Sequence, residues 1–306
     1  MIYTLTTNPA VDVTMTMDSF KSHTVNRPKS EEYSANGKGI NVAYVLQKLG
    51  VPVTTLGFFG GFSGKYIAGE VQNKGIACYP VFVDGITRIN FSVTTADGEE
   101  YKVSGNGCAV SPEKQRELLT LIDGLQDMDM LVVSGSLSPG MEPCFYDELA
   151  VLLEKKNVPL VLDISSPYLK DLLKYRPLLI KPNEHELAEV FGLSCATQDE
   201  VKASMQQLHA WGVENVLLTM GEKGMYFSNG SELYFTDTYP IEFVSSVCAG
   251  DGTLGAFLSV WRKTDVTEAL KLAAAVGADI VGSMGMGELE RYPYFKEKII
   301  VRKCCQ

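Results

Sequence analysis

The stretch LVLDISSPYLKDLLKYRPLLIKPNEHELAEVF, residues 160–191, contains the pattern that decides the fold class. Two short apolar runs, Leu160–Ile164 and Leu178–Ile180, are each stopped by small or polar residues, and the second leads into a helical pattern at Glu184–Phe191. Runs with so few polar residues on either face are expected of strands that helices cover on both sides. The stretch therefore predicts β-α units of a parallel sheet.

The same alternation extends through the rest of the chain. Further strands are predicted at Ile2–Thr6, Val53–Phe58, Met130–Val133 and Val216–Thr219. Helical patterns are found at Ile40–Leu49, Pro112–Leu125, Pro143–Lys156, Gln198–Trp211, Asp251–Arg262 and Val266–Ser283. Repeated β-α alternation predicts a doubly wound α/β sheet with helices on both faces. Ligands of this class bind beyond the carboxyl ends of the strands.

Two segments, residues 10–35 and 87–104, break this rhythm because polar and apolar residues alternate in them. Asp97-Gly98 between two alternating runs is typical of a hairpin turn. We therefore expect a small antiparallel sheet whose bare face covers a ligand or contacts another subunit. Because the 306 residues contain no low-complexity linker, we expect one domain over residues 1–306 with this sheet as its lid.

Composition narrows the choice of partners and compartment. A net charge of −10 disfavours binding to nucleic acid and to anionic membranes. The seven cysteines form no C-x-x-C pair and no Cys/His cluster, which predicts reduced thiols and no structural zinc. The first residues lack a basic signal-peptide region, and no stretch approaches the about 20 apolar residues of a membrane helix. We expect a cytoplasmic protein.

The segment SVCAGDGT, residues 246–253, leads into an apolar helix. Small residues allow a tight turn into a helix whose first N–H groups bind an anion. A carboxylate at that place, Asp251, accepts a proton from a hydroxyl while the amides stabilise a transferring group. Asp is also a common N-cap, and the segment alone leaves both interpretations open.

A second glycine-rich segment, SANGKGINVA, spans residues 34–43. Its glycines admit a polar ligand, Lys38 offers a cation and Asn41 can bond to sugar hydroxyls, although a plain turn with an exposed lysine fits as well. The segment lacks the third glycine of a dinucleotide fingerprint, and FGGFSGKY at 59–66 lacks the first glycine and the Ser/Thr of a P-loop. A phosphate site of another type is expected.

Other polar segments follow predicted strands and reach the same edge of the sheet. These are SGSLSPG at 134–140, Asp163, KPNEHE at 181–186 and the turn MGEKG at 220–224. Their acidic and amide groups suit Mg²⁺ held through water, although Glu184 and Glu186 would equally stabilise a helix N-terminus. The three histidines are far apart in the sequence and predict no metal or nucleophile set.

Together these motifs resemble the ribokinase/phosphofructokinase-B sugar kinase family over the whole chain. The resemblance rests on GKGINVA at 37–43, SGS at 134–136, KPNEHE at 181–186 and AGD at 249–251. TLTTNPAVD at 4–12 and TRIN at 87–90 are similar to the 1-phosphofructokinase and tagatose-6-phosphate kinase branch. It implies a ribokinase-like three-layer α/β/α sandwich, ATP and Mg²⁺ as cofactors, and a homodimer through the lid.

The resemblance also implies roles for single residues. Asp251 would be the catalytic base, with the amides around Ala249, Gly250 and Asp251 as the anion hole and Cys248 beside it. The residues implied to hold the sugar, and the phosphate already on it, are Asp12, Lys38, Gly39, Asn41 and Ser136, and Arg88 with Arg27 and Lys102. Those implied to bind nucleotide are Asn183, Glu186, Thr219, Gly221 and Gly224, with Glu186 and Asp163 near Mg²⁺.

The implied reaction moves the γ-phosphoryl group of ATP onto a primary hydroxyl of D-fructose 1-phosphate, giving the 1,6-bisphosphate. Tagatose 6-phosphate and fructose 6-phosphate are the alternatives within the class. The family usually has glycine where Asn36 and Cys248 stand, and often serine where Gly252 stands. These departures keep open a catalytically weak phosphosugar-binding protein, with a nicotinamide-dependent oxidoreductase a more distant alternative.

Overall fold

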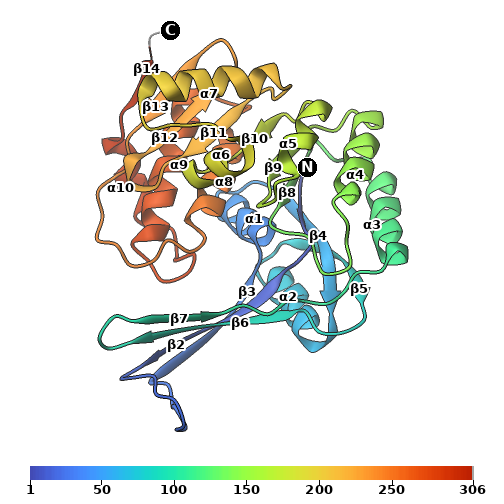
Figure 1. The fold of residues 1–306 in the computed structure, drawn as a ribbon, viewed down its shortest axis with the longest axis vertical. Helices are drawn as coiled ribbons and strands as arrows, with labels where there is room; N and C mark the ends of the chain where they lie inside the picture. Colours follow the sequence, from blue (N-terminus) through green and yellow to red (C-terminus); the bar gives the residue numbers. More distant parts are fainter. Residues whose placement is uncertain (305–306) are drawn as a thin grey trace.

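The apolar runs of the sequence form one large sheet, which a computed structural model describes together with the rest of residues 1–304 (Figure 1). The strand order is β14-β13-β12-β11-β10-β9-β8-β1-β4-β5. The ten strands are β1 (Ile2–Thr6), β4 (Val53–Gly60), β5 (Ala77–Val83), β8 (Met130–Ser134), β9 (Leu160–Asp163), β10 (Leu179–Ile180), β11 (Val216–Thr219), β12 (Met225–Ser228), β13 (Leu233–Thr236) and β14 (Val301–Cys304). Neighbouring strands are parallel throughout the part of the sheet from β11 to β5. Strands β12, β13 and β14 form an antiparallel edge, which the sequence patterns did not predict.

Helices cover both faces of this sheet, as predicted. One layer contains α1 (Lys38–Lys48), α2 (Gly61–Asn73), α8 (Ala249–Val260), α9 (Val266–Val281) and α10 (Tyr292–Lys298). The other contains α3 (Pro112–Gly124), α4 (Cys144–Lys155), α5 (Leu169–Leu172), α6 (Glu184–Phe191) and α7 (Gln198–Ala210). Short 3₁₀ turns lie at Leu173–Tyr175 and Gly221–Lys223. Alternate side chains of β8 enter the two cores, Leu131 on one side and Val132 on the other, so the three-layer α/β/α sandwich is confirmed.

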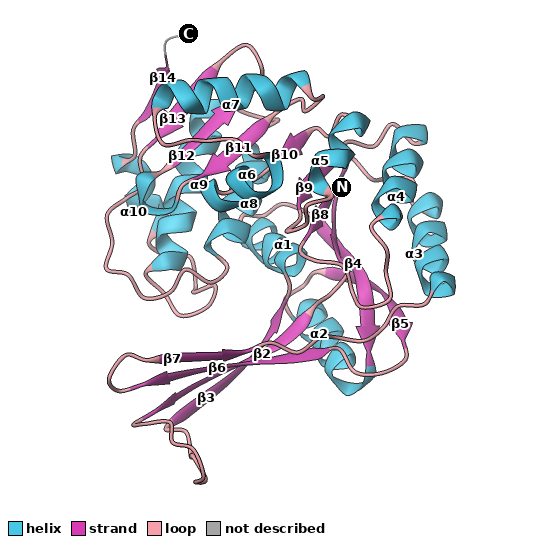
Figure 2. Cartoon of the chain, in the orientation of Figure 1, coloured by secondary structure: helices cyan, strands magenta, loops and turns pink. Residues whose placement is uncertain are grey.

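A second, four-stranded sheet extends away from this body and forms the lid (Figure 2). Its order is β3-β2-β6-β7, with β2 (Ala10–Met17), β3 (Ser30–Asn36), β6 (Arg88–Thr95) and β7 (Glu100–Val103). The predicted lid is present, but it is not wholly antiparallel, because β2 and β6 pair in parallel. Between them the chain returns to the large sheet to build α1, β4, α2 and β5, so both strands leave the body in the same direction.

No helix within residues 1–304 is long and apolar enough to cross a lipid bilayer.

Candidate active site

The carboxyl ends of the central strands meet at one edge of the large sheet. Thr6 of β1 pairs with Ser134 of β8, which pairs with Asp163 of β9. The chain winds toward β4 and β5 on one side of β1 and toward β8–β11 on the other, and such a reversal opens a crevice. A cleft of about 1120 Å³ lies at this edge and is lined by residues that include Lys38, Asn183, Thr219, Gly221 and Asp251.

Helix α8 begins at Ala249, two residues earlier than predicted. Its N-cap is Cys248, a non-glycine residue in the left-handed region with φ 65°, and the Cys248 side chain makes no capping hydrogen bond. The N-cap interpretation of Asp251 is therefore wrong, because this residue lies inside the first turn. Within residues 1–304 no side chain caps the first-turn N–H groups of Gly250 and Asp251, and both residues line the cleft, where a helix N-terminus attracts an anion.

The carboxyl of Asp251 is 7% exposed and accepts a hydrogen bond of 2.8 Å from Asn41 Nδ2. Burial raises the pKa of Asp251 to about 7, and the negative charge of Asp163 acts in the same direction. Asn41, Lys38 and Lys181 oppose this rise. A buried carboxyl with a pKa near neutrality is suited to accept a proton at physiological pH.

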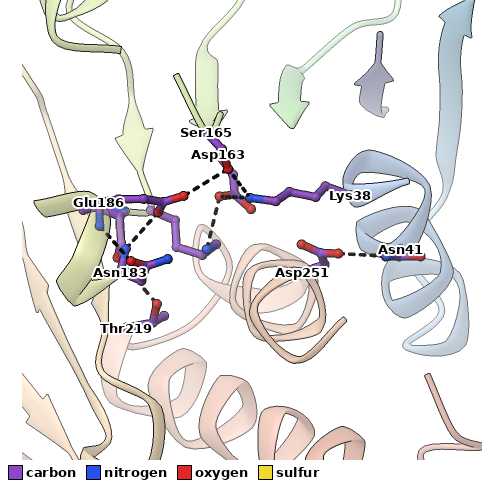
Figure 3. A network of polar contacts seen from close by, with 10 residues as sticks. Lys38, Asn41, Asp163, Ser165, Asn183, Glu186, Thr219 and Asp251 are labelled. Carbon is purple, nitrogen blue, oxygen red and sulfur yellow. Dashed lines mark hydrogen bonds and ion pairs between the residues drawn. The ribbon is translucent and has the colours of Figure 1, made fainter. Parts of the chain in front are cut away.

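Two lysines and a second aspartate complete a cluster of charges opposite Asp251 (Figure 3). Asp163 Oδ1 lies 3.2 Å from Lys181 Nζ and 3.5 Å from Lys38 Nζ. Burial works against the charge on Lys38, but Asp163, Asp251 and Glu186 together hold the pKa of Lys38 above its ordinary value. The cluster thus keeps two cations at the rim of the first turn of α8.

Lys181 is the site residue to which sequence reasoning gave no role. Its side chain is only 5% exposed, and its Nζ lies 3.5 Å from the place where a Cβ on Gly250 would stand. Lysine is almost never buried unless it is paired. A lysine directly after the buried run Leu179–Ile180 was therefore a usable signal for a charge aimed into the site.

The start of α6 holds two of the residues expected to bind nucleotide. Asn183 Oδ1 accepts from the backbone N–H of Glu186, and Glu186 Oε2 accepts from that of Asn183, forming a capping box. Ser165 links this box to Lys38, since it donates to Glu186 Oε1 at 3.1 Å and meets Lys38 Nζ at 3.0 Å (Figure 3). Glu186 thus stabilises the helix N-terminus, as one sequence interpretation held, and also faces the charge cluster.

The other expected nucleotide residues lie across the cleft from α8. Thr219 ends β11 and forms an isolated parallel bridge with Asn183. Gly221 and Gly224 have φ of +56° and +99° in the turn that follows. A Cβ on Gly224 would lie 2.1 Å from Thr236 O, whereas a Cβ on Gly221 would meet open space. Only glycine therefore suits position 224, and Gly221 leaves the cleft wall open.

The acidic residues at the cleft, Asp163 and Glu186, are partly suited to hold Mg²⁺ through water molecules. Both carboxylate oxygens of Asp163 are buried without a hydrogen-bond partner within the described chain, but Asp163 Oδ1 faces two lysines. Glu186 is partly exposed, and its oxygens accept two hydrogen bonds. Residues 1–304 contain no cluster of three His, Cys, Asp or Glu side chains that would bind a metal directly. Water-mediated contact is the mode that this donor set allows.

On the lid, Asp12 and Arg88 face the same side of the sheet. Asp12 accepts from Asn90 Nδ2 and Asn36 Nδ2, each at 2.7 Å. Burial raises the pKa of the Asp12 carboxyl, against the opposing effects of Asn90, Arg88 and Asn36. Arg88 donates to Asn8 O at 2.9 Å, while its Nε is buried without a partner among the described residues. A buried N–H donor without a partner is costly, which favours an anionic ligand there.

The cations expected to join Arg88 do not gather around it in this chain. Lys102 pairs with Ser92, four residues along β6 from Arg88, and its ammonium bonds to Glu100. Arg27 is exposed in the loop between β2 and β3. The three cations therefore do not form one cluster in a single chain, because Lys102 lies four residues along the sheet from Arg88 and Arg27 lies in the loop, and joint binding of phosphate by the three stays a prediction.

Two further expected sugar contacts take different positions. A Cβ on Gly39 would lie 2.6 Å from Thr6 Oγ1, so this glycine lets α1 pack closely on β1. Ser136 is exposed in the loop after β8, and its backbone O accepts from Thr7 Oγ1 at 2.8 Å. The neighbouring Gly135 lies beside Lys38.

Comparisons with known proteins concern the family and the fold of the whole chain. The sequence matches the family described as pfkB family carbohydrate kinase over residues 5–291. It is 44% identical to the D-tagatose-1-phosphate kinase of Klebsiella oxytoca, covering 98% of this chain and 99% of that one. It is 32% identical to the 1-phosphofructokinase of Bacillus subtilis, with 95% of each covered. Phosphofructokinase-2 from Escherichia coli shares the fold, with a TM-score of 0.86 at 24% identity over 96% of this chain and 99% of that one.

Proposed function

Because the chain belongs to the pfkB family of carbohydrate kinases, as an ATP-dependent phosphosugar kinase, we propose that it phosphorylates a ketohexose 1-phosphate on its free primary hydroxyl. The substrate placed first is D-tagatose 1-phosphate, because the 44%-identical relative carries that activity in its name. D-fructose 1-phosphate, the substrate expected from the sequence, comes second on the 32%-identical relative. The observation that carries the chemistry is the buried Asp251 in the uncapped first turn of α8.

Asp251 acts as the base. As the oxygen of the primary hydroxyl bonds to the γ-phosphorus, the bond between that phosphorus and the bridging oxygen of ADP breaks, and the hydroxyl proton passes to the Asp251 carboxylate. Asn41 keeps this carboxylate oriented through its 2.8 Å hydrogen bond. In a loose phosphoryl-transfer transition state, positioning contributes more than proton abstraction.

The negative charge of the transferring group is balanced by three features of the cleft. The N–H groups of Gly250 and Asp251 are free of side-chain caps, and Lys181 lies directly beside Gly250. Lys38 stands on the opposite rim and is held by Asp163 and Ser165. Such donors act before the reaction starts and therefore need no reorganisation.

Nucleotide would lie between α8 and the β11–β12 turn, against Thr219, Gly221 and Gly224. When bound, Mg²⁺ would neutralise negative charge on the phosphates of ATP. Glu186 would hold it through water, with Asn183 beside it. Asp163 is assigned mainly to the two lysines, because its Oδ1 already faces both.

The phosphate on the substrate would bind to Arg88, whose buried Nε has no partner within residues 1–304. Asp12 would receive sugar hydroxyls, since its carboxylate faces the same side of the lid. A guanidinium presents a planar fork of donors that matches a phosphate.

We also propose that the lid binds a second copy of the chain. On the face opposite Asp12, the residues Tyr33, Val13, Phe91 and Val103 lie in one row across the four strands. Tyr33, Phe91 and Val103 are exposed by 55%, 43% and 64%. Exposed apolar rows on an edge sheet favour association. Val103→Asp would convert a wild-type dimer to a monomer by light scattering, whereas a monomeric wild type would refute the proposal.

The direct test of the proposed function measures ADP release with Mg²⁺–ATP against the 1-phosphates and 6-phosphates of tagatose and fructose, with ribose as the control sugar. The expected result is a clear preference for a ketohexose 1-phosphate, with tagatose ahead of fructose. Preference for a 6-phosphate would overturn the substrate assignment while keeping the class. Absence of turnover with all four, in a folded preparation that binds them, would favour the phosphosugar-binding alternative.

A further inference from the structure

Asn36, the last residue of β3, occupies a junction between the lid and the catalytic helix that the proposed function does not use. Its Nδ2 donates to Asp12 Oδ2 at 2.7 Å. Its Oδ1 accepts from the Gly37 N–H at 2.6 Å and from Asn41 Nδ2 at 2.9 Å. The Asp12 carboxylate and the Gly37 N–H each have a fixed role as acceptor or donor. The orientation of the Asn41 amide, in contrast, depends on its contact with Asn36.

These contacts permit one orientation of the Asn36 amide. The Gly37 N–H is a donor only, and an ionised Asp12 carboxylate is an acceptor only. Turning the Asn36 amide over would place its NH₂ against the Gly37 N–H and its carbonyl oxygen against the Asp12 carboxylate. Both contacts would become repulsive, so Asn36 Oδ1 must face Asn41.

The orientation of Asn36 in turn fixes that of Asn41. Asn41 is 2% exposed, and its Nδ2 contacts both Asn36 Oδ1 at 2.9 Å and Asp251 Oδ2 at 2.8 Å. An amide NH₂ has two hydrogens, so one meets each oxygen. With one hydrogen held by Asn36, the other is directed at the carboxylate of Asp251. A flipped Asn41 would turn its carbonyl oxygen toward two acceptors.

We infer that Asn36 is a positioning residue that connects the sugar-binding face of the lid to the catalytic base through the chain Asn90–Asp12–Asn36–Asn41–Asp251. This inference rests on the proposed role of Asp251. Movement of Asp12 as a sugar hydroxyl binds is transmitted through two amides to the carboxylate that takes the proton. The base is thus oriented best when the lid is in place over the sugar.

Cys248 packs against this chain and completes it. Its Sγ lies 3.3 Å from Asn41 Nδ2 and 3.8 Å from Asn36 Nδ2. Burial, with further contributions from Asp251 and Asp12, raises the pKa of the thiol to about 12, so it stays neutral. Asn36 and Cys248, the two positions where the family usually has glycine, therefore contact each other. The thiol fills the space beside both amides without adding a charge.

The charged groups around Asp251 determine what a test must control. Asp163 from β9 raises the pKa of Asp251, whereas Lys38 from α1 and Lys181 after β10 lower it together with Asn41. Arg88 lies near Asp12 at the other end of the chain. A substitution at Asn36 adds or removes no charge, and Asn41 is the residue that hydrogen-bonds to both Asn36 and Asp251.

The experiment compares the pH dependence of kcat, with saturating ATP and D-tagatose 1-phosphate, for the wild type and for Asn36→Ala. Because Asn41 lowers the pKa of Asp251, loss of its fixed orientation moves the acid limb of the profile to higher pH. We expect kcat at pH 6.5 to fall roughly three- to ten-fold, with a much smaller change at pH 9, as a weakened hydrogen bond to a charged group implies. Asn73→Ala, which removes only a surface bond to Glu70, is the matched control.

A double-variant cycle tests the route. If the effect passes through Asn41, the acid limb of Asn36→Ala/Asn41→Ala coincides with that of Asn41→Ala. An unmoved limb in Asn36→Ala, or additive shifts in the cycle, would overturn the inference. Asn36→Ser, which keeps a hydroxyl at the site, serves if the alanine variant does not fold. If Asp251→Asn loses turnover as expected but the acid limb of Asn36→Ala does not move, only the proposed link through Asn36 is refuted. If Asp251→Asn stays active, the assignment of Asp251 as the base is refuted.

Discussion

The two ends of the site differ in how completely one chain builds them. At the edge of the large sheet, Asp251, Asp163 and Lys181 are buried and paired, so their charges are arranged before any substrate arrives. On the lid, the Nε of Arg88 has no partner among residues 1–304, and Arg27 lies exposed in the loop between β2 and β3. The groups proposed to carry the chemistry are therefore preorganised in the body of the large sheet, whereas a group proposed to recognise the phosphosugar still has a donor free for the ligand. Substitutions at the first end should act on kcat, and substitutions at the second on KM.

The largest expected effect breaks the preorganised end. Asp251→Asn should lower kcat by roughly 10²- to 10⁴-fold, the usual contribution of a positioned general base, with a smaller change in the KM values. Asp199→Asn, in the exposed first turn of α7, is the matched control and should leave turnover unchanged. Steady-state kinetics with ATP and D-tagatose 1-phosphate provides the measurement. Turnover close to wild type in Asp251→Asn would mean that another group takes the proton.

The next effect tests the lid end. Arg88→Ala should remove the charge-assisted contact proposed between Arg88 and the substrate phosphate, so KM for the phosphosugar should rise roughly 10- to 100-fold while KM for ATP changes little. Arg116→Ala, exposed on α3, controls for loss of a positive charge. Equal increases in both KM values would show that Arg88 supports the whole fold of the site and does not bind the phosphosugar specifically.

The same contrast explains what the sequence could and could not predict. Buried parallel strands such as Ile2–Thr6 and Val216–Thr219 were predicted with their observed bounds, because runs covered on both faces leave a clear apolar signal. Helix α2 and strand β5 were missed. Glycines at the start of α2 resemble a loop, yet Gly64 is there because a Cβ would lie 2.7 Å from the backbone of Phe59. In β5 the pattern is interrupted by Tyr79 and Pro80.

Within the site, single motifs located the main groups but not their mutual contacts. The glycine-rich and AGD segments pointed to Lys38, Asn41 and Asp251, which the fold does bring to one edge. The buried pairing of Lys181 with Asp163 depends on two strands that lie side by side only in the folded sheet. The separation of Lys102 from Arg88 depends on strand register in the same way.

A smaller effect concerns the free energy of unfolding, because burying Asp251 makes it depend on pH. The folded protein holds the proton of Asp251 up to about pH 7, while the ordinary pKa of this carboxyl is 3.8. Between these values the unfolded chain binds fewer protons than the folded one, so this group's contribution to the free energy of unfolding falls as pH rises. Asp251→Asn does not titrate, and its Tm relative to wild type should therefore increase from pH 5 to pH 8. A difference in Tm that is constant over this range would contradict the raised pKa.

The smallest expected effect concerns Cys248, where the two ends of the site meet. At φ 65° a side chain costs about 1–2 kcal/mol that glycine avoids, although glycine loses part of this gain through its greater freedom in the unfolded chain. Cys248→Gly should therefore be more stable than Cys248→Ala by about 1 kcal/mol in denaturant unfolding. Both variants remove the sulfur that packs on Asn36 and Asn41, so their difference isolates backbone strain from lost packing. Equal stability of the two variants would mean that the left-handed conformation is not strained at this N-cap. A loss of activity shared by both would then be attributed to the missing contact with the two amides.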